Sequence, residues 1–97
     1  MQKQPAIYIL TNKRNGTLYT GVTSNLIQRI WQHKQHQVDG FSKRYKLDWL
    51  VYYELHQSML DAIIREKQLK AGSCTNKIKL NESTNPYWND LYPALLG

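Results

Sequence analysis

The stretch "AIYILTNKRNGTLYTGV", residues 6–22, decides the fold because it holds two strand-like runs and a turn between them. The runs Ala6–Leu10 and Leu18–Val22 are apolar and rich in residues that favour strands. Between them, Asn15-Gly16 is a strong signal for a two-residue turn, since both residues tolerate positive φ. We therefore predict an antiparallel hairpin.

The turn also predicts the register of this hairpin. A two-residue turn at positions 15–16 pairs Leu10 with Gly21 and Tyr8 with Thr23. Because side chains alternate along a strand, Tyr8 and Tyr19 then share one face, whereas a loop of three or five residues would reverse this. Gly21 lies next on the same face and leaves a gap where a ligand could approach the backbone.

A helix is predicted to follow, with Ser24 as its N-cap and its end near Gln35. Arg29, His33 and His36 share a second face beside its apolar stripe, because they follow the i, i+4, i+7 spacing. The stripe predicted to be buried consists of Leu26, Ile27, Ile30 and Trp31.

A basic loop, residues 38–48, comes next and is followed by the apolar run "WLVYYEL", residues 49–55. We predict that this run forms a central strand. In the loop, Lys43, Arg44 and Lys46 are candidates for phosphate contacts without sequence preference, and Tyr45 is a candidate for base stacking.

A second helix is predicted from a capping box, with Ser58 at the N-cap and Asp61 at the third helical position. It runs to about Lys70, and Gly72 ends it. Glu66 is predicted to lie at the edge of its apolar stripe, where it needs a cation or a metal unless it simply pairs with Lys70 or points to solvent. The residues predicted to face the core are Leu60, Ile63, Ile64 and Leu69.

The remaining chain is predicted to form a short helix over about residues 74–81 and a turn at Asn85-Pro86. The ending "YWNDLYPALL" carries enough apolar bulk to pack back onto the domain. We assign Trp49 and Trp88 to the core.

Composition narrows the class of protein. The 97 residues are long enough for one domain with one core, with no need of disulfides. A single cysteine excludes an internal disulfide and fits a reducing, cytoplasmic compartment. The apolar run after Pro5 is too short for a signal peptide or a membrane span.

Charge points to an anionic partner. The chain has a net charge of +6, and all of the excess lies in the first 48 residues, with eight Lys and Arg against two acids. With three Trp and seven Tyr available for stacking, nucleic acid is the leading candidate. A basic surface that serves only solubility is the alternative.

Five separated features, taken in order, resemble the GIY-YIG nuclease domain family. They are a tyrosine in "AIYIL", a tyrosine in "LYTGV", Arg29, His33 and Glu66 within "DAIIREKQLK". The likeness covers nearly the whole chain and is greatest to small stand-alone bacterial members, which are similar to the N-terminal nuclease domain of the bacterial excision-repair endonuclease. Ala6 and Thr20 replace a glycine and an isoleucine of the family motifs, and "SCTNK" after Gly72 is less basic than in those members.

This resemblance implies an α+β fold in which helices flank a small three-stranded antiparallel sheet, as one domain over residues 1–97. It also implies hydrolysis of phosphodiester bonds in DNA with one divalent ion, Mg²⁺ or Mn²⁺. Glu66 would bind the metal, Arg29 would contact the scissile phosphate, and Tyr19 would orient or deprotonate the attacking water with Tyr8 as its hydrogen-bonded companion. His33 is the alternative base, since its ordinary pKa is better matched to neutral pH.

Fold does not fix activity, so two further functions stay open. One is a module that binds DNA or RNA without cleaving it, and the other is an adaptor that recruits partners into a repair complex. Cleavage is favoured because the implied catalytic positions are all filled. A pure protein adaptor would not need the basic first half.

Overall fold

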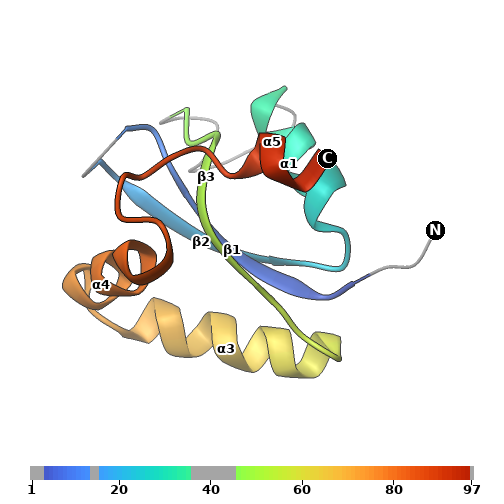
Figure 1. Ribbon diagram of the computed structural model, residues 1–97. Coiled ribbons are helices and arrows are strands. Elements are labelled where there is room, and N and C mark those ends of the chain that lie inside the picture. Colours follow the sequence, from blue (N-terminus) through green and yellow to red (C-terminus); the bar gives the residue numbers. More distant parts are fainter. Residues whose placement is uncertain (1–3, 14–15, 36–45, 97) are drawn as a thin grey trace.

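The computed structural model describes residues 4–13, 16–35 and 46–96, and in α4 nothing is described of the Cys74 side chain. Its three strands form one antiparallel sheet in the order β2-β1-β3, with helices on both sides (Figure 1). This confirms the predicted α+β fold. The strands are β1 (Ala6–Thr11), β2 (Leu18–Thr23) and β3 (Trp49–Leu55).

The central strand is β1, so the prediction that residues 49–55 would be central is wrong. Every residue of β1 is buried, because the strand has a neighbour on each edge and helices on each face. In β3, burial fades from Leu50 to the exposed Leu55. An apolar run therefore indicated a covered strand but not its place in the sheet.

The hairpin forms in a register two residues away from the predicted one. Tyr8 lies opposite Gly21 and Leu10 opposite Tyr19, and the last pair is Thr11 with Leu18. Beyond this pair, the Thr11 hydroxyl donates to the carbonyl of Lys13 at 2.8 Å, and the Gly16 amide donates to the same carbonyl at 3.0 Å. The connection is thus six residues rather than two, and Asn15 lies outside the described residues. Since six is also even, the shared face of the two tyrosines is confirmed.

The helices begin at side-chain caps. Asn25, not Ser24, caps α1 by accepting from the amide of Gln28. Ser58 caps α3 as predicted, and Gly72 ends it with a φ of −79°, so no left-handed residue is required there. The bounds are α1 (Leu26–Lys34), α3 (Met59–Ala71), α4 (Cys74–Thr84) and α5 (Tyr92–Leu96).

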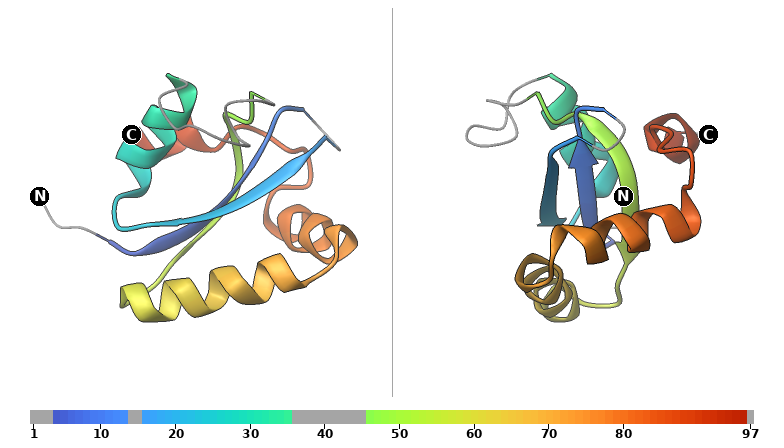
Figure 2. Two further views of the ribbon diagram at one scale, coloured as in Figure 1. Left: turned by 180° about the vertical axis from the view of Figure 1, so that it is seen from behind. Right: turned by 90° about the vertical axis from the view of Figure 1, so that its left-hand side faces the viewer.

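The helices make two layers, with α1 and α5 on one face of the sheet and α3 and α4 on the other (Figure 2). Tyr8 and Tyr19 belong to the α1 face. Trp88 is fully buried on the α3 face, as predicted, whereas Trp49 is only partly buried. No helix in the described part of the chain is long and apolar enough to cross a membrane.

Both predicted helix stripes need correction. Ile27 and Trp31 of α1 are 43% and 46% exposed, and α1 instead buries Leu26, Ile30 and His33. These three residues follow the i, i+4, i+7 spacing of one helix face. A search for apolar residues alone misses this face because one of the three is a histidine.

In α3, Leu60 and Ile64 are 67% and 48% exposed, and Ile63 is only partly buried. The face turned to the sheet contains Ala62 and Leu69, both buried. Of the residues predicted to face the core, only Leu69 is buried. The face of α3 that packs on the sheet is therefore not its most apolar face.

The C-terminal segment packs back onto the domain, as predicted. Residues 85–91, which we call the C-terminal strap, run along the outer edge of β3. The Leu91 amide donates to the carbonyl of Leu50 at 2.7 Å, and Asn85 Nδ2 donates to the carbonyl of Val51 at 3.1 Å. The strap thereby pairs backbone groups that an edge strand would leave open.

Candidate active site

Tyr8 and His33 form the buried centre of the candidate site. The Tyr8 hydroxyl lies 3.0 Å from His33 Nε2, and the two ring centroids are 5.6 Å apart. Tyr8 comes from the central strand and His33 from the inner face of α1. This hydrogen bond therefore joins the sheet to the helix.

Tyr19 completes a cluster of three rings. Its ring centroid is 6.4 Å from that of Tyr8 and 5.9 Å from that of His33. Tyr19 is only partly buried, in contrast to the other two side chains. Of the three, it is the one with surface open to solvent or substrate.

Burial sets the protonation states of the inner pair. Burial, with a smaller effect of Arg29, lowers the pKa of His33 from 6.5 to about 4. Burial and the neighbouring Tyr19 raise the pKa of Tyr8 well above its ordinary value of 10. At neutral pH the imidazole is therefore uncharged and Tyr8 keeps its proton, so Tyr8 can donate to His33 Nε2.

The gap predicted at Gly21 is filled by the protein itself. A Cβ placed on Gly21 would lie 2.4 Å from both Cζ and the hydroxyl oxygen of Tyr8. Glycine is thus required here because the Tyr8 ring lies against the opposite strand. The expectation of a ligand gap rested on Gly21 sharing a face with Tyr19, but in the observed register Tyr8 lies opposite Gly21 and its ring takes that space.

Arg29 and Glu66 act on Tyr8 from different helices. The charge of Arg29 lowers the pKa of Tyr8, whereas that of Glu66 raises it. Both charges must therefore lie near enough to the Tyr8 hydroxyl to be felt there. Arg29 is on α1 and Glu66 on α3, which cover opposite faces of the sheet.

Glu66 lies within the sheet-facing stripe of α3, between Ala62 and Leu69, rather than at its edge as predicted. Its side chain is only 14% exposed, and its Oε2 lies 3.4 Å from Nζ of Lys70, which is half exposed. The alternative of a simple i, i+4 pair is thus present, but the carboxylate is more buried than such a surface pair requires.

The donor set fits one hard divalent ion. Mg²⁺ takes one or two carboxylates together with water and substrate phosphate, and Glu66 is a largely buried carboxylate whose charge affects the Tyr8 hydroxyl. Within the described ranges, no three His, Cys, Asp or Glu side chains gather into a metal cluster. The residues therefore suit an ion that is also held by its substrate.

Of the predicted phosphate-binding residues, Lys43, Arg44 and Tyr45 lie outside the described residues. Lys46 is described and exposed, with a φ of 55°. Among the described contacts, none joins Lys46 to the ring cluster.

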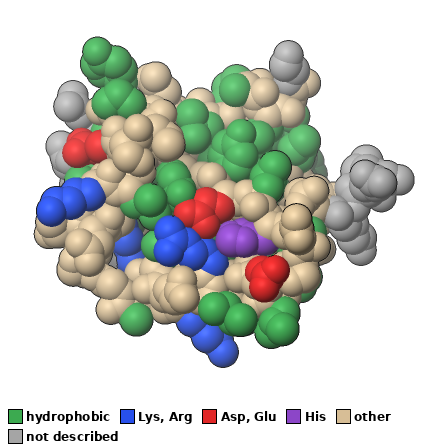
Figure 3. Space-filling view, turned by 60° about the horizontal axis from the view of Figure 1, so that its bottom comes forward, with side chains coloured by type: hydrophobic (Ala, Val, Ile, Leu, Met, Phe, Trp, Pro, Cys, Tyr) green, Lys and Arg blue, Asp and Glu red, His purple; other side chains and the backbone are tan. Residues whose placement is uncertain are grey.

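A second polar group was not predicted from the sequence. Glu54 of β3 accepts hydrogen bonds from Arg65 of α3, with Oε1 3.0 Å from Nε and Oε2 3.0 Å from Nη2. His56 Nε2 lies 3.2 Å from the same carboxylate. Figure 3 shows an acidic, a basic and a histidine side chain side by side on this face of the molecule. The sequence feature that could have indicated this group is Glu54, an acidic residue near the end of the apolar run 49–55.

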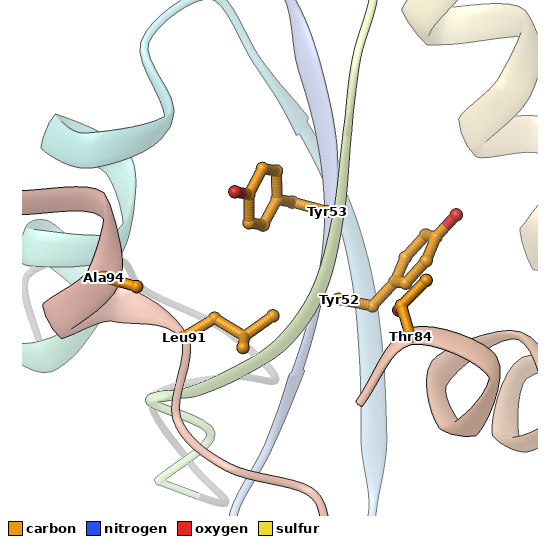
Figure 4. Close-up of a pocket in the computed structure, with 5 residues that line it drawn as sticks. All are labelled: Tyr52, Tyr53, Thr84, Leu91 and Ala94. Carbon is orange, nitrogen blue, oxygen red and sulfur yellow. The ribbon is translucent and has the colours of Figure 1, made fainter. Parts of the chain in front are cut away.

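A cavity of about 400 Å³ opens beside β3, and it shares Tyr52 with the Glu54 group, because the Tyr52 hydroxyl donates to Glu54. Figure 4 shows Tyr52 and Tyr53 pointing to opposite sides of the strand. No predicted site residue lines this cavity, and none of its lining side chains is charged at neutral pH, so it offers little to a phosphate. Its lining residues are Tyr52, Tyr53, Thr84, Leu91 and Ala94.

Comparison with known proteins identifies the class of protein. Residues 4–79 match the GIY-YIG catalytic domain, which is more than three quarters of the chain. The chain therefore belongs to the GIY-YIG catalytic domain family, and a nuclease-like function is implied. The matched range includes the three rings, Arg29 and Glu66.

The relatives found are small bacterial proteins. The chain is 35% identical over 74 residues to a UPF0213 protein of Staphylococcus saprophyticus, which covers 76% of this chain and 89% of the relative. It is 36% identical over 76 residues to a UPF0213 protein of Staphylococcus haemolyticus, covering 78% and 92%. A UPF0213 protein of Pediococcus pentosaceus is 36% identical over 72 residues, covering 74% and 75%. No solved structure matches.

Proposed function

We propose that this protein is a metal-dependent endonuclease that hydrolyses phosphodiester bonds in DNA. The observation that carries the proposal is the cluster of Tyr8, Tyr19 and His33, with the charges of Arg29 and Glu66 felt at the Tyr8 hydroxyl. Family membership supports the same class of reaction.

Tyr8 and His33 act as a fixed pair in this proposal. Because the pKa of His33 is about 4, its ring holds an abstracted proton poorly, and its Nε2 is already bonded to Tyr8. The pair therefore orients the site. Tyr19, more exposed and in contact with both rings, is the better placed of the three to orient or deprotonate the attacking water.

Arg29 and Glu66 supply the charges. Arg29 is assigned to the scissile phosphate, since a guanidinium can donate two parallel hydrogen bonds to phosphate oxygens. Glu66 is assigned to hold Mg²⁺ or Mn²⁺. When bound, the ion supplies stabilisation of the negative charge that develops on the phosphate.

The proposed substrate is DNA, recognised by its structure rather than its sequence, in repair or other processing. Excess positive charge in the first 48 residues supports phosphate contacts, which do not depend on base sequence. Lys43, Arg44, Tyr45 and Lys46 stay predicted contributors to this contact.

A cleavage panel tests the proposal. Single-stranded, duplex, flapped and branched DNA and a matched RNA are incubated with protein and Mg²⁺ or Mn²⁺. We expect cleavage of at least one DNA, and a loss of at least about 100-fold in Glu66→Gln and in Arg29→Met. Asp61→Asn, which removes an exposed acid from the same helix as Glu66, is the matched control and keeps activity.

Two outcomes would contradict the proposal. Cleavage that survives Glu66→Gln would remove the metal-binding role of that residue. Salt-sensitive DNA binding with no cleavage of any substrate would favour the non-catalytic binding module instead.

A further inference from the structure

Helix α3 carries Glu66 but is held to the sheet by little apolar packing. Of its thirteen residues, all of which the structure describes, only Ala62 and Leu69 are buried. Ala62 is small, so it allows close approach without interlocking with its neighbours. Apolar contacts alone therefore give weak control over the rotation of this helix about its own axis.

A polar contact supplies what the packing lacks. Arg65 donates from Nε and Nη2 to the two oxygens of Glu54, a two-pronged geometry that fixes direction as well as distance. The side chains of Arg65 and Glu54 are 33% and 21% exposed, so the pair is partly shielded from solvent.

Glu54 is itself held in place by two further donors. The Tyr52 hydroxyl donates to Glu54 Oε2, and His56 Nε2 lies 3.2 Å from Oε1. Burial alone would raise the pKa of Glu54, but the hydrogen bonds from Arg65 and Tyr52 outweigh it and lower the pKa. Burial and the bond to Glu54 raise the pKa of Tyr52 to about 12. Near neutral pH, therefore, Glu54 is ionised and Tyr52 is a donor.

We propose that Glu54 and Arg65 are positioning residues that set the rotation of α3 and thereby set the direction of the Glu66 carboxylate. Successive residues on an α-helix are about 100° apart, so fixing the direction of Arg65 fixes that of its neighbour Glu66. Lys70 cannot do this, because it is on the same helix as Glu66 and half exposed. The metal part of this inference rests on the proposed function.

The rotation can be measured directly by NMR, without metal or substrate. The Ala62 methyl group belongs to one apolar cluster with Ile7 and Ile9 of β1. We expect its NOEs to these two side chains to change in Glu54→Gln and in Arg65→Met, and to change less in Arg65→Lys, which keeps the charge but not the fork. The matched control is Ser58→Ala, which removes the N-cap of α3 but leaves the Glu54–Arg65 pair intact.

Metal binding is the second measurement. Mn²⁺ is titrated into ¹⁵N-labelled protein, and paramagnetic broadening of the amides around Glu66 is followed. We expect Glu54→Gln and Arg65→Met to need about tenfold more Mn²⁺ for half-maximal broadening, as is typical when a partner that orients a ligand is lost. We expect Ser58→Ala to need no more Mn²⁺ than wild type, even when its midpoint of thermal unfolding falls as far as those of Glu54→Gln and Arg65→Met.

The two measurements separate the inference from the proposed function. Unchanged Ala62 NOEs in Glu54→Gln, or changes no larger than in Ser58→Ala, would overturn the positioning role whatever the metal does. Broadening in wild type that Glu66→Gln does not remove would overturn the metal site. Altered NOEs in Glu54→Gln and Arg65→Met alone would still establish the positioning role.

Discussion

Tyr8 shows how neighbours decide what a side chain does. Its hydroxyl is buried against His33, and its ring occupies the space above Gly21. Burial raises its pKa, so at neutral pH it is a hydrogen-bond donor and not a base. Tyr19 has the same side chain but is only partly buried, and this difference in burial is why we propose a different role for it.

The contact between Tyr8 and Gly21 gives a stability prediction. We expect Gly21→Ala to cost about 1–3 kcal/mol of unfolding free energy in urea, because the new methyl group meets a ring that His33 holds in place. In a Tyr8→Leu background the same change should cost clearly less. Equal costs in the two backgrounds would show that the ring is not the obstacle.

His33 gives a prediction of pH dependence. Its pKa is about 4 in the folded state, against an ordinary 6.5, so the unfolded state binds more protons between these values and stability rises with pH. The contribution is complete above about pH 6.5 and is lost as the pH falls toward 4. We expect unfolding free energy at pH 5 to be about 2 kcal/mol lower than at pH 7.

The control for this prediction is His33→Gln, which keeps a polar partner for Tyr8 but does not titrate. Its unfolding free energy should change little between pH 7 and pH 5. Glu54, whose pKa is lowered, contributes a loss only below its ordinary value of 4.5, outside this window. A His33→Gln variant as pH-dependent as wild type would assign the effect to another group.

At the residue scale, alternation along the strands predicted the shared face of Tyr8 and Tyr19, because it depends only on even or odd spacing. The register was not predicted, since the Asn-Gly pair favours a two-residue turn, whereas six residues connect the strands and the Thr11 hydroxyl bonds to the Lys13 carbonyl within them. The burial of His33 was missed because its burial depends on a partner from a strand 25 positions earlier in the chain.

At the scale of elements, α3 shows the limit of apolar periodicity. Its N-cap, Ser58, was correctly predicted from sequence, because a cap is a local interaction. Its inner face was not, because Ala62 and Glu66 take the places where larger apolar residues were expected. The helix uses a small residue and an acid where it meets the sheet.

Two leucines of α3, both predicted to face the core, differ in exposure and should therefore differ in their effect on stability. Leu60 is 67% exposed, so Leu60→Gln should change unfolding free energy by no more than about 0.5 kcal/mol. Leu69 is 8% exposed, and Leu69→Ala should cost about 2–4 kcal/mol. Urea unfolding of both variants is the measurement. Comparable losses of unfolding free energy in the two variants would show that Leu60 belongs to the core, as apolar periodicity alone predicts.

At the scale of the whole molecule, contacts between distant segments complete the fold. The set of strands and the main helices could be predicted from local patterns. The C-terminal strap could be predicted only as apolar bulk, because its hydrogen bonds join Asn85 and Leu91 to residues 50–51. The range that matches the family ends at residue 79, so the strap lies beyond it.

Asp90 is the point where the strap meets both β3 and α1. Its carboxylate accepts from the amides of Leu50 at 3.2 Å and Tyr92 at 3.1 Å, and lies 2.6 Å from Nζ of Lys34. Lys34 also donates to the carbonyl of Asp48 at 2.8 Å and lies over the Tyr92 ring. One acid thus ties the end of the chain to the helix that carries Arg29 and His33.

The two kinds of bond at Asp90 can be separated by substitution. Asp90→Asn keeps an acceptor for the backbone amides but loses the charge, so we expect a cost of about 1 kcal/mol in urea unfolding. Asp90→Ala also leaves the Leu50 amide without its acceptor and should cost about 2–3 kcal/mol. Lys34→Met should cost more than Asp90→Asn, because it also loses the bond to the Asp48 carbonyl and the contact with the Tyr92 ring. The two changes together should cost less than their sum, because both remove the Lys34–Asp90 ion pair. If Asp90→Ala cost no more than Asp90→Asn, the contribution of Asp90 would come from its charge alone, and raising the salt concentration would then weaken that contribution.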